Sequence, residues 1–288
     1  MNKMKVQTVM VIGAGQMGGG IAQVMAAAGI KTYLNDVNME IVESRVEFIQ
    51  GLLSKGVAKE KITEEQKNET LKNLIPSVSL EDALDCDLVV EAIVENMEIK
   101  SKVFSQLDKI CKPDCILASN TSSLPITEIA ASTNRPEKVI GMHFMNPVPI
   151  MKLVEIIRGL ATTDDTYQII HDLSLILNKT PVEVRDVPGF ISNRVLQVMI
   201  NEAIFCLYEG VASIEDIDTV MKLGMNHPMG PLQLADFIGL DTVLAIMETL
   251  HEGYSDSKYR PAPLLRQYVK AGWLGKKTGR GFYNYNRE

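Results

Sequence analysis

The stretch Thr8-Val-Met-Val-Ile-Gly-Ala-Gly-Gln-Met-Gly18 decides the fold. Its apolar half, residues 8–12, predicts a short buried strand that ends abruptly at a glycine. Residues 18–29 then predict an Ala-rich helix closed by Gly29, and residues 30–35 predict a second strand. A strand, a glycine turn, a helix and a second strand within about 30 residues are typical of the opening of a parallel α/β domain.

The glycine turn also predicts a dinucleotide site. Glycines at this spacing allow a tight turn, let the backbone approach a pyrophosphate, and bring the helix close to the strand. The predicted site includes the glycines and the first residues of the helix, namely Gly13, Gly15, Gln16, Met17 and Gly18. Asp36, at the end of the second strand, can accept hydrogen bonds from both ribose hydroxyls and would repel a 2′-phosphate. This favours NAD over NADP, with a purely structural glycine turn as the alternative.

The rest of the first domain continues the α/β pattern. The polar stretch 38–73 is too long for a simple crossover and predicts two helices in a projecting hairpin, broken near Gly56. Further elements are predicted after it: strands at 87–91, 115–118, 139–144 and 151–157, and a helix at 97–110.

The segment Asp186-Val-Pro-Gly189 predicts a domain boundary, because Pro and Gly separate two differently patterned regions. The predicted organisation is a Rossmann-type, doubly wound α/β domain over residues 1–187 and an all-α domain over residues 188–288. Helices are expected in the second domain at 190–209, 214–222, 231–250 and 263–271.

Composition narrows the classes of function. The chain has 288 residues and a net charge of −7, so it is a poor general binder of nucleic acid or of an anionic membrane. The sequence has no uninterrupted apolar run of about 18 residues and no secretory leader is recognised, so we expect a cytoplasmic protein. Its four cysteines, Cys86, Cys111, Cys115 and Cys206, lack zinc spacing. They are expected to be reduced packing residues, with no metal.

A histidine and a glutamate predict an acid–base pair. Glu155 interrupts the apolar run 153–157, and a carboxylate in a buried strand needs a partner. If the strands on either side of Pro149 form a hairpin, His143 lies opposite Glu155. A glutamate beside a histidine orients the ring and favours its protonated form. A structural contact between the two is the alternative.

The chain resembles the L-3-hydroxyacyl-CoA dehydrogenases from Val11 to Tyr285, and most of all the compact bacterial 3-hydroxybutyryl-CoA dehydrogenases. The motifs that carry this resemblance are Gly13-Ala-Gly-Gln-Met-Gly18, Ser119-Asn-Thr-Ser-Ser123, His143-Phe-Met-Asn-Pro-Val-Pro-Ile-Met-Lys-Leu-Val-Glu155, Pro188-Gly-Phe-Ile-Ser-Asn-Arg194, Pro228-Met-Gly-Pro231 and Lys277-Thr-Gly-Arg-Gly-Phe-Tyr283. The resemblance implies NAD-dependent interconversion of (S)-3-hydroxybutyryl-CoA, or another short 3-hydroxyacyl-CoA, and acetoacetyl-CoA or the matching 3-oxoacyl-CoA.

The resemblance also implies roles for individual residues. His143 would be the acid–base residue with Glu155 as its partner, and Ser122 and Asn193 would donate hydrogen bonds to substrate oxygens. Ser123 is the alternative to Ser122. Because Asn193 begins the second domain, the site would be completed only where the domains meet. The implied cofactor positions are Asp36, Glu95, Lys100, Asn120, Ser122, Asn146 and Lys277.

Two lysines are candidates for the coenzyme A end of the substrate. Lys55 and Lys59 are four residues apart and share one face if that stretch is helical, so they could meet its phosphates. Solvated surface lysines are the alternative. The resemblance further implies a homodimer through the helical domain. Two other functions stay open: a hydroxyacid dehydrogenase acting on free acids, which would use a catalytic lysine, and a non-enzymatic structural protein.

Overall fold

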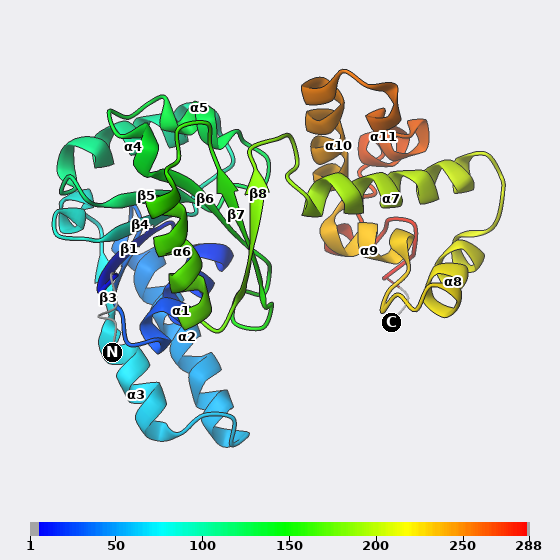
Figure 1. Ribbon diagram of the computed structural model, residues 1–288. Coiled ribbons are helices and arrows are strands. Elements are labelled where there is room, and N and C mark those ends of the chain that lie inside the picture. The colour runs from blue at the N-terminus through cyan, green and yellow to red at the C-terminus, as the bar shows by residue number, and fades with distance from the viewer. Residues whose placement is uncertain (1–5, 287–288) are drawn as a thin grey trace. The chain divides into compact units, whose positions relative to one another are not determined.

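A computed structural model describes residues 6–286 and divides the chain into two compact units, 1–186 and 187–288 (Figure 1). Each unit has its own hydrophobic core. All four cysteines are free thiols, and three of them are buried, as predicted. Among the described residues, no helix has the length and apolar character needed to cross a membrane.

The first unit is built on a sheet whose strands, within residues 6–186, follow the order β3-β2-β1-β4-β5-β6-β7-β8. Neighbouring strands are parallel, except that β6 and β7 are antiparallel. The predicted fold class, a doubly wound sheet with a second all-α part, is confirmed. The strands are β1 Thr8–Ile12, β2 Lys31–Asn35, β3 Leu74–Ser77, β4 Leu88–Glu91, β5 Ile116–Ser119, β6 Val139–Phe144, β7 Leu153–Arg158 and β8 Thr180–Arg185.

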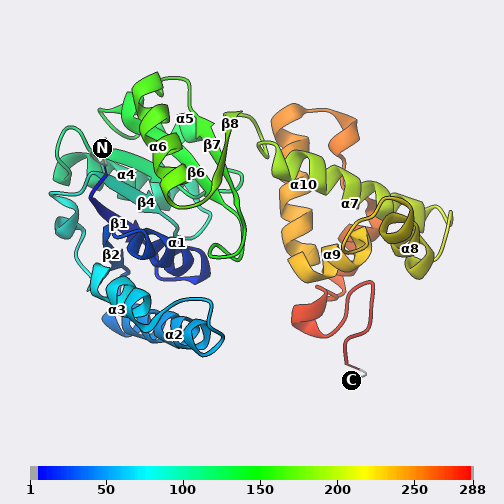
Figure 2. The ribbon, with the colours of Figure 1, turned by 60° about the horizontal axis from the view of Figure 1, so that its bottom comes forward.

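Helices cover both faces of this sheet, with α4 and α5 on the opposite side from α1 (Figure 2). Ile21 and Met25 of α1 and Ile170 of α6 share one core cluster with Val9 and Val11 of β1. The α-helices of this unit are α1 Gln16–Ala27, α2 Met39–Ala58, α3 Glu64–Asn73, α4 Met97–Ile110, α5 Ile126–Ala130 and α6 Asp164–Ile176. Two short 3-10 helices lie at Leu80–Ala83 and Pro136–Lys138.

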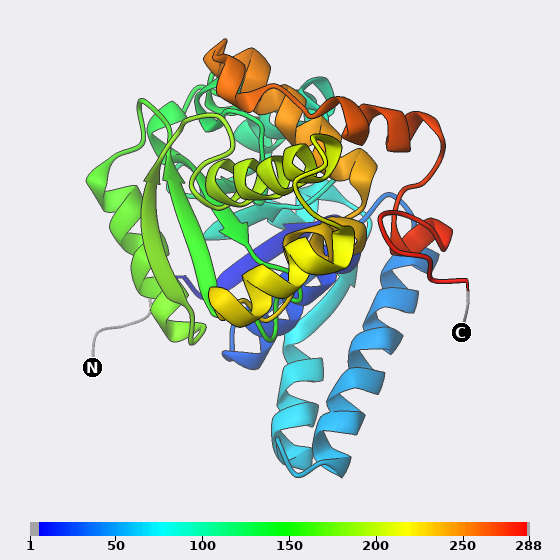
Figure 3. The ribbon, with the colours of Figure 1, turned by 90° about the vertical axis from the view of Figure 1, so that its right-hand side faces the viewer.

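The helical hairpin is formed by α2 and α3, which extend together away from the strands (Figure 3). The break comes close to the predicted position: α2 continues through Gly56 and ends two residues later, at Ala58. A Cβ atom on Gly56 would lie 3.3 Å from the side chain of Ile62, so the glycine makes room for the returning chain. The break comes just before α3, where Thr63 and Gln66 form a capping box.

Besides the two 3-10 helices, four elements of the first unit were not predicted: β3, α5, α6 and β8. The two strands lie at opposite edges of the sheet and contain Pro76 and Pro181. Proline lacks the N–H that a central strand needs, and it is tolerated at sheet edges. An apolar pattern broken by proline therefore gave no strand signal in the sequence.

The second unit consists of helices around its own core. The single helix predicted at 231–250 is wrong: it is two helices, α9 and α10, separated at Gly239. Gly239 has a φ angle of 100°, which interrupts a helix and strains any residue with a side chain. The α-helices here are α7 Ser192–Tyr208, α8 Ile214–Gly224, α9 Pro231–Ile238, α10 Leu240–Tyr254 and α11 Pro263–Lys270. Two 3-10 helices lie at Ser257–Tyr259 and Lys276–Thr278.

Candidate active site

The glycine turn after β1 combines two tightly packed glycines with one open glycine. A Cβ atom on Gly13 would lie 2.5 Å from the carbonyl oxygen of Ala92, and one on Gly18 would lie 1.7 Å from that of Gly13. Gly15 has no neighbouring atom within 4 Å of the position of such a Cβ. The outer glycines therefore hold the turn against the sheet, and the middle one leaves open space above it.

The beginning of α1 is suited to an anionic ligand. Gly15 is the N-cap residue, no side chain caps the helix, and its first turn contains no acidic residue. The first N–H groups of the helix and its positive end thus lie beside the open glycine. A diphosphate fits such a helix end. Gln16 donates a hydrogen bond to Asn146 Oδ1 at 3.0 Å, whereas Met17 packs against the core.

Asp36 holds the same turn. Its Oδ2 accepts a hydrogen bond from the Ala14 N–H, and its Oδ1 accepts one from the Val37 N–H, both at 2.7 Å. Arg45 of α2 donates from Nε to the Ala14 carbonyl at 2.9 Å. A cavity of about 520 Å³ opens at this point, lined by Ala14, Gly15, Glu40, Ile41, Ser44, Arg45 and Phe48.

His143 and Glu155 form a buried pair. The antiparallel register of β6 and β7 sets them directly opposite each other, which confirms the predicted hairpin. His143 Nδ1 lies 2.8 Å from Glu155 Oε2, and the two residues are only 6% and 2% exposed. On the other side of the ring, Nε2 lies 3.1 Å from Ser122 Oγ. Carboxylate, imidazole and hydroxyl therefore form one line of hydrogen-bonding groups.

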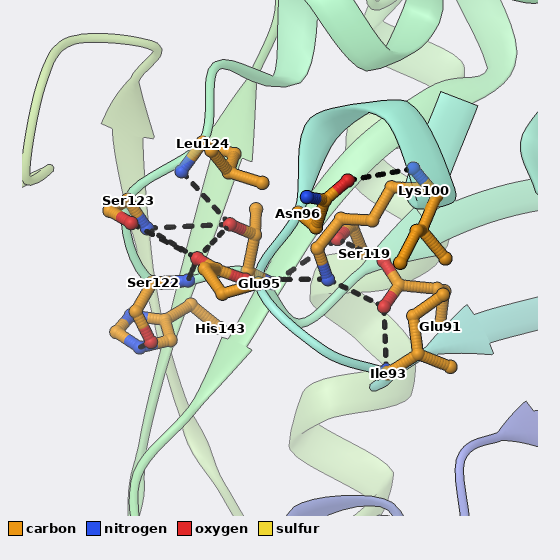
Figure 4. A network of polar contacts seen from close by, with 12 residues as sticks. Glu91, Ile93, Glu95, Asn96, Lys100, Ser119, Ser122, Ser123, Leu124 and His143 are labelled. Atoms are coloured by element: carbon orange, nitrogen blue, oxygen red, sulfur yellow. Dashed lines mark hydrogen bonds and ion pairs between the residues drawn. The ribbon is translucent and has the colours of Figure 1, made fainter. Parts of the chain in front are cut away.

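Glu95 organises the loop that carries Ser122 (Figure 4). Its Oε1 accepts hydrogen bonds from the Ser122 N–H at 3.0 Å and from Thr121 Oγ1 at 2.5 Å. Both the N–H and the hydroxyl of Ser123 also donate to this oxygen, so Ser123 faces Glu95 while Ser122 faces the histidine. Burial acts to raise the pKa of Glu95, but the Lys100 charge and these hydrogen bonds outweigh it and lower the pKa.

Lys100 is one of the most deeply buried side chains of the molecule, at 1% exposed. Its ammonium lies 2.6 Å from Glu91 Oε1 and 3.4 Å from Glu95 Oε2. Lys100 is therefore not a solvated lysine on the surface of its helix. Asn120, 8% exposed, accepts the Phe144 N–H at 2.9 Å and so links the ends of β5 and β6. The predicted cofactor residues of the first unit thus gather where its parallel strands end.

Four predicted residues lie outside this cluster. Lys55 is exposed near the end of α2, and Lys59 is exposed just beyond its last residue. Asn193 is the second residue of α7, and Lys277 bonds to Asp241 at 2.7 Å; both belong to the second unit. No group of three or more His, Cys, Asp or Glu residues within 6–286 is arranged to hold a metal ion.

Three further residues of the site were not predicted from the sequence: Glu91, Thr121 and Arg45. Glu91 was detectable, because it closes the apolar strand β4 as Glu155 interrupts β7. The argument that a buried carboxylate needs a partner applies to both. Arg45 and Thr121 carried no such signal, since their contacts depend on tertiary placement.

Comparison with known proteins gives matches over nearly the whole chain. Residues 8–187 match the family model of the 3-hydroxyacyl-CoA dehydrogenase NAD binding domain, and residues 189–285 match that of the C-terminal domain. A probable 3-hydroxybutyryl-CoA dehydrogenase of Bacillus subtilis is 61% identical over 285 residues, covering 99% of each chain. The human mitochondrial hydroxyacyl-coenzyme A dehydrogenase is 45% identical, over 98% of this chain and 92% of that one. The crystal structure of (S)-3-hydroxybutyryl-CoA dehydrogenase from Ralstonia eutropha superposes with a TM-score of 0.96, at 49% identity, covering 98% of this chain and all of the other.

Proposed function

Because the chain belongs to the 3-hydroxyacyl-CoA dehydrogenase family, we propose that it interconverts (S)-3-hydroxybutyryl-CoA and acetoacetyl-CoA with NAD as its cofactor. The observation that carries this proposal is the line from Glu155 through His143 to Ser122, with separations of 2.8 Å and 3.1 Å. This line combines an acid–base group, its anionic partner and a hydroxyl. It lies near the carboxyl ends of the parallel strands, where α/β proteins bind ligands.

The residues around the glycine turn fit NAD. The helix end at Gly15 would hold the diphosphate, and Asp36 would accept hydrogen bonds from the adenine ribose. Five further residues are proposed to complete the cofactor site: Glu95, Lys100, Asn120, Asn146 and Lys277. Lys100 would contribute while it stays paired with Glu91 and Glu95. When bound there, NADH would supply the hydride that reduces the C3 carbonyl.

His143 would act as the acid in reduction. Its Nε2 would give a proton to the oxygen that forms at C3, and Ser122 Oγ would donate a hydrogen bond to the same oxygen. Glu155 would stabilise the protonated ring through Nδ1 and hold its orientation. In oxidation the histidine would take the proton back. We propose that Asn193 holds the thioester end of the substrate.

One face of α2 is proposed to contact coenzyme A. Residues 41, 48, 52, 55 and 59 recur at spacings that place them on one side of a helix. Ile41, Phe48 and Leu52 are 45%, 55% and 39% exposed, and Lys55 and Lys59 follow them. An apolar stretch followed by two cations matches a ligand with an apolar arm and terminal phosphates.

A homodimer is proposed through the second unit. Val195 of α7 and Val220 and Leu223 of α8 are 66%, 60% and 83% exposed. Strongly exposed apolar side chains on two helices that contact each other are typical of a protein interface. Sedimentation of the native chain and of Leu223→Glu tests this: we expect a dimer that the substitution weakens, and a native monomer would contradict it.

Activity with a free hydroxyacid is disfavoured, because that chemistry expects a catalytic lysine and Lys100 is held by two carboxylates. The test is the rate of NADH oxidation with acetoacetyl-CoA, with free acetoacetate as the control. We expect turnover with the thioester only. Equal rates with both compounds, or no turnover with the thioester, would refute the proposed substrate.

A further inference from the structure

Glu91 is the most deeply buried carboxylate near the site, at 0% exposed, and the proposed chemistry does not use it. It ends β4, and its side chain makes three hydrogen bonds. Oε1 accepts from Lys100 Nζ at 2.6 Å and from the Ile93 N–H at 2.7 Å, and Oε2 accepts from Ser119 Oγ at 2.7 Å. A buried charge is tolerated when it is paired and hydrogen-bonded in this way.

Lys100 connects this carboxylate to the loop of the active site. The same ammonium lies 3.4 Å from Glu95 Oε2, while the other oxygen of Glu95 binds the N–H groups of Ser122 and Ser123. Figure 4 shows the sequence of contacts from Glu91 through Lys100 and Glu95 to the loop beside His143.

The charges make this arrangement sensitive to Glu91. One ammonium is shared by two carboxylates, and the closer one, at 2.6 Å, is Glu91. Without the Glu91 charge, the only carboxylate left near the ammonium in this network is Glu95, which it would then approach. Glu95 would turn toward the lysine, and its hydrogen bonds to the loop would lengthen.

We infer that Glu91 is a positioning residue, which acts through Lys100 and Glu95 to place the Ser122 hydroxyl beside His143. The inference rests on the proposed function of Ser122. Glu91→Gln should lower kcat about 10- to 100-fold, since displacements of about 1 Å at a reacting group have effects of this size.

The test is a double-mutant cycle of Glu91→Gln with Ser122→Ala. If Glu91 acts through Ser122, its substitution should lower kcat far less when the hydroxyl is already absent. An equal fold-loss in both backgrounds would overturn the inference. The matched control is Asp108→Asn, which removes another carboxylate of this unit, 2.8 Å from Arg135 Nε. It should lower the melting temperature and leave kcat unchanged.

Two further measurements separate the possible failures. Inactive native enzyme with acetoacetyl-CoA would refute the proposed function, whereas active native enzyme with normal Glu91→Gln turnover would refute this inference alone. If Glu91→Gln does not fold, Ser119→Ala takes its place in the cycle. It removes the hydrogen bond that Ser119 Oγ donates to Glu91 and the one that it accepts from the Thr121 N–H, and it keeps every charge. Additivity with Ser122→Ala would again overturn the inference.

Discussion

Replacement of His143 by Gln tests the proposed chemistry directly. Glutamine keeps a polar side chain but cannot deliver a proton, so kcat should fall by roughly 10²–10⁴-fold, the typical contribution of a positioned acid–base group. The turn at Gly15 follows β1 and Asp36 follows β2, and in the sheet β4 and β5 separate these strands from β6, which carries His143. NADH binding should therefore persist.

The magnitude for Glu155→Gln follows from the geometry of the pair. Glutamine at position 155 can keep the 2.8 Å contact with His143 Nδ1, but it removes the negative charge. A hydrogen bond to a charged group is worth about 1.5–3 kcal/mol and a neutral one about 0.5–1.5 kcal/mol, so the substitution should cost about 1–1.5 kcal/mol. At about 1.36 kcal/mol for each factor of ten, kcat should fall roughly 5- to 15-fold, less than for the histidine.

The assay is the loss of NADH absorbance with acetoacetyl-CoA for the native chain, both single variants and the double variant, with NADH binding measured alongside. Residues that act as one unit should be strongly non-additive, so the double variant should resemble His143→Gln. Near-normal turnover in His143→Gln would refute the mechanism, and so would simple addition of the two losses.

Three other variants test the cofactor preference, the contact with coenzyme A and the stability in acid. The native chain should prefer NADH over NADPH, and Asp36→Ser with a neighbouring Arg should shift kcat/KM toward NADPH; equal native rates at low cofactor concentration would contradict this. Replacing Lys55 and Lys59 by Gln should raise the KM for acetoacetyl-CoA more than that for NADH, and high salt should mimic part of the loss; an unchanged KM would make them ordinary surface lysines. The lowered pKa of Glu95 stabilises the fold above its ordinary value of 4.5, and this contribution is lost as pH falls through the folded value. Melting temperatures of Glu95→Gln and the native chain should therefore converge in acid, and a gap that stays constant down to low pH would argue against it.

Local signals in the sequence were sufficient for the parts of the fold with regular patterns. The glycine turn, the apolar strands and the pairing of His143 with Glu155 all follow from spacing and from the cost of burying a charge. Several differences between prediction and structure fall at residues that interrupt such patterns. Pro76 and Pro181 lie in edge strands, and Gly239 divides one expected helix into two.

The site shows a similar division. Ser122 was chosen over Ser123 by resemblance alone, and only the tertiary contacts explain the choice: one hydroxyl meets His143 and the other meets Glu95. The surroundings of Lys100 were likewise out of reach, because its two partners come from a strand end and a loop. Sequence spacing predicts neighbours on one helix or one hairpin, but not residues that meet across several connections.

The bond between Asp36 and the Ala14 N–H has a consequence for how this family changes its cofactor. The Asp36 carboxylate, which would select the ribose, also stabilises the glycine turn that would hold the diphosphate, because it accepts a hydrogen bond from that turn. Replacing Asp36 by a smaller residue in the course of evolution would remove this hydrogen bond and destabilise the turn at the same time. Adaptation to a phosphorylated ribose therefore begins with a loss for either dinucleotide, and a second substitution that restores the turn must accompany or precede the first.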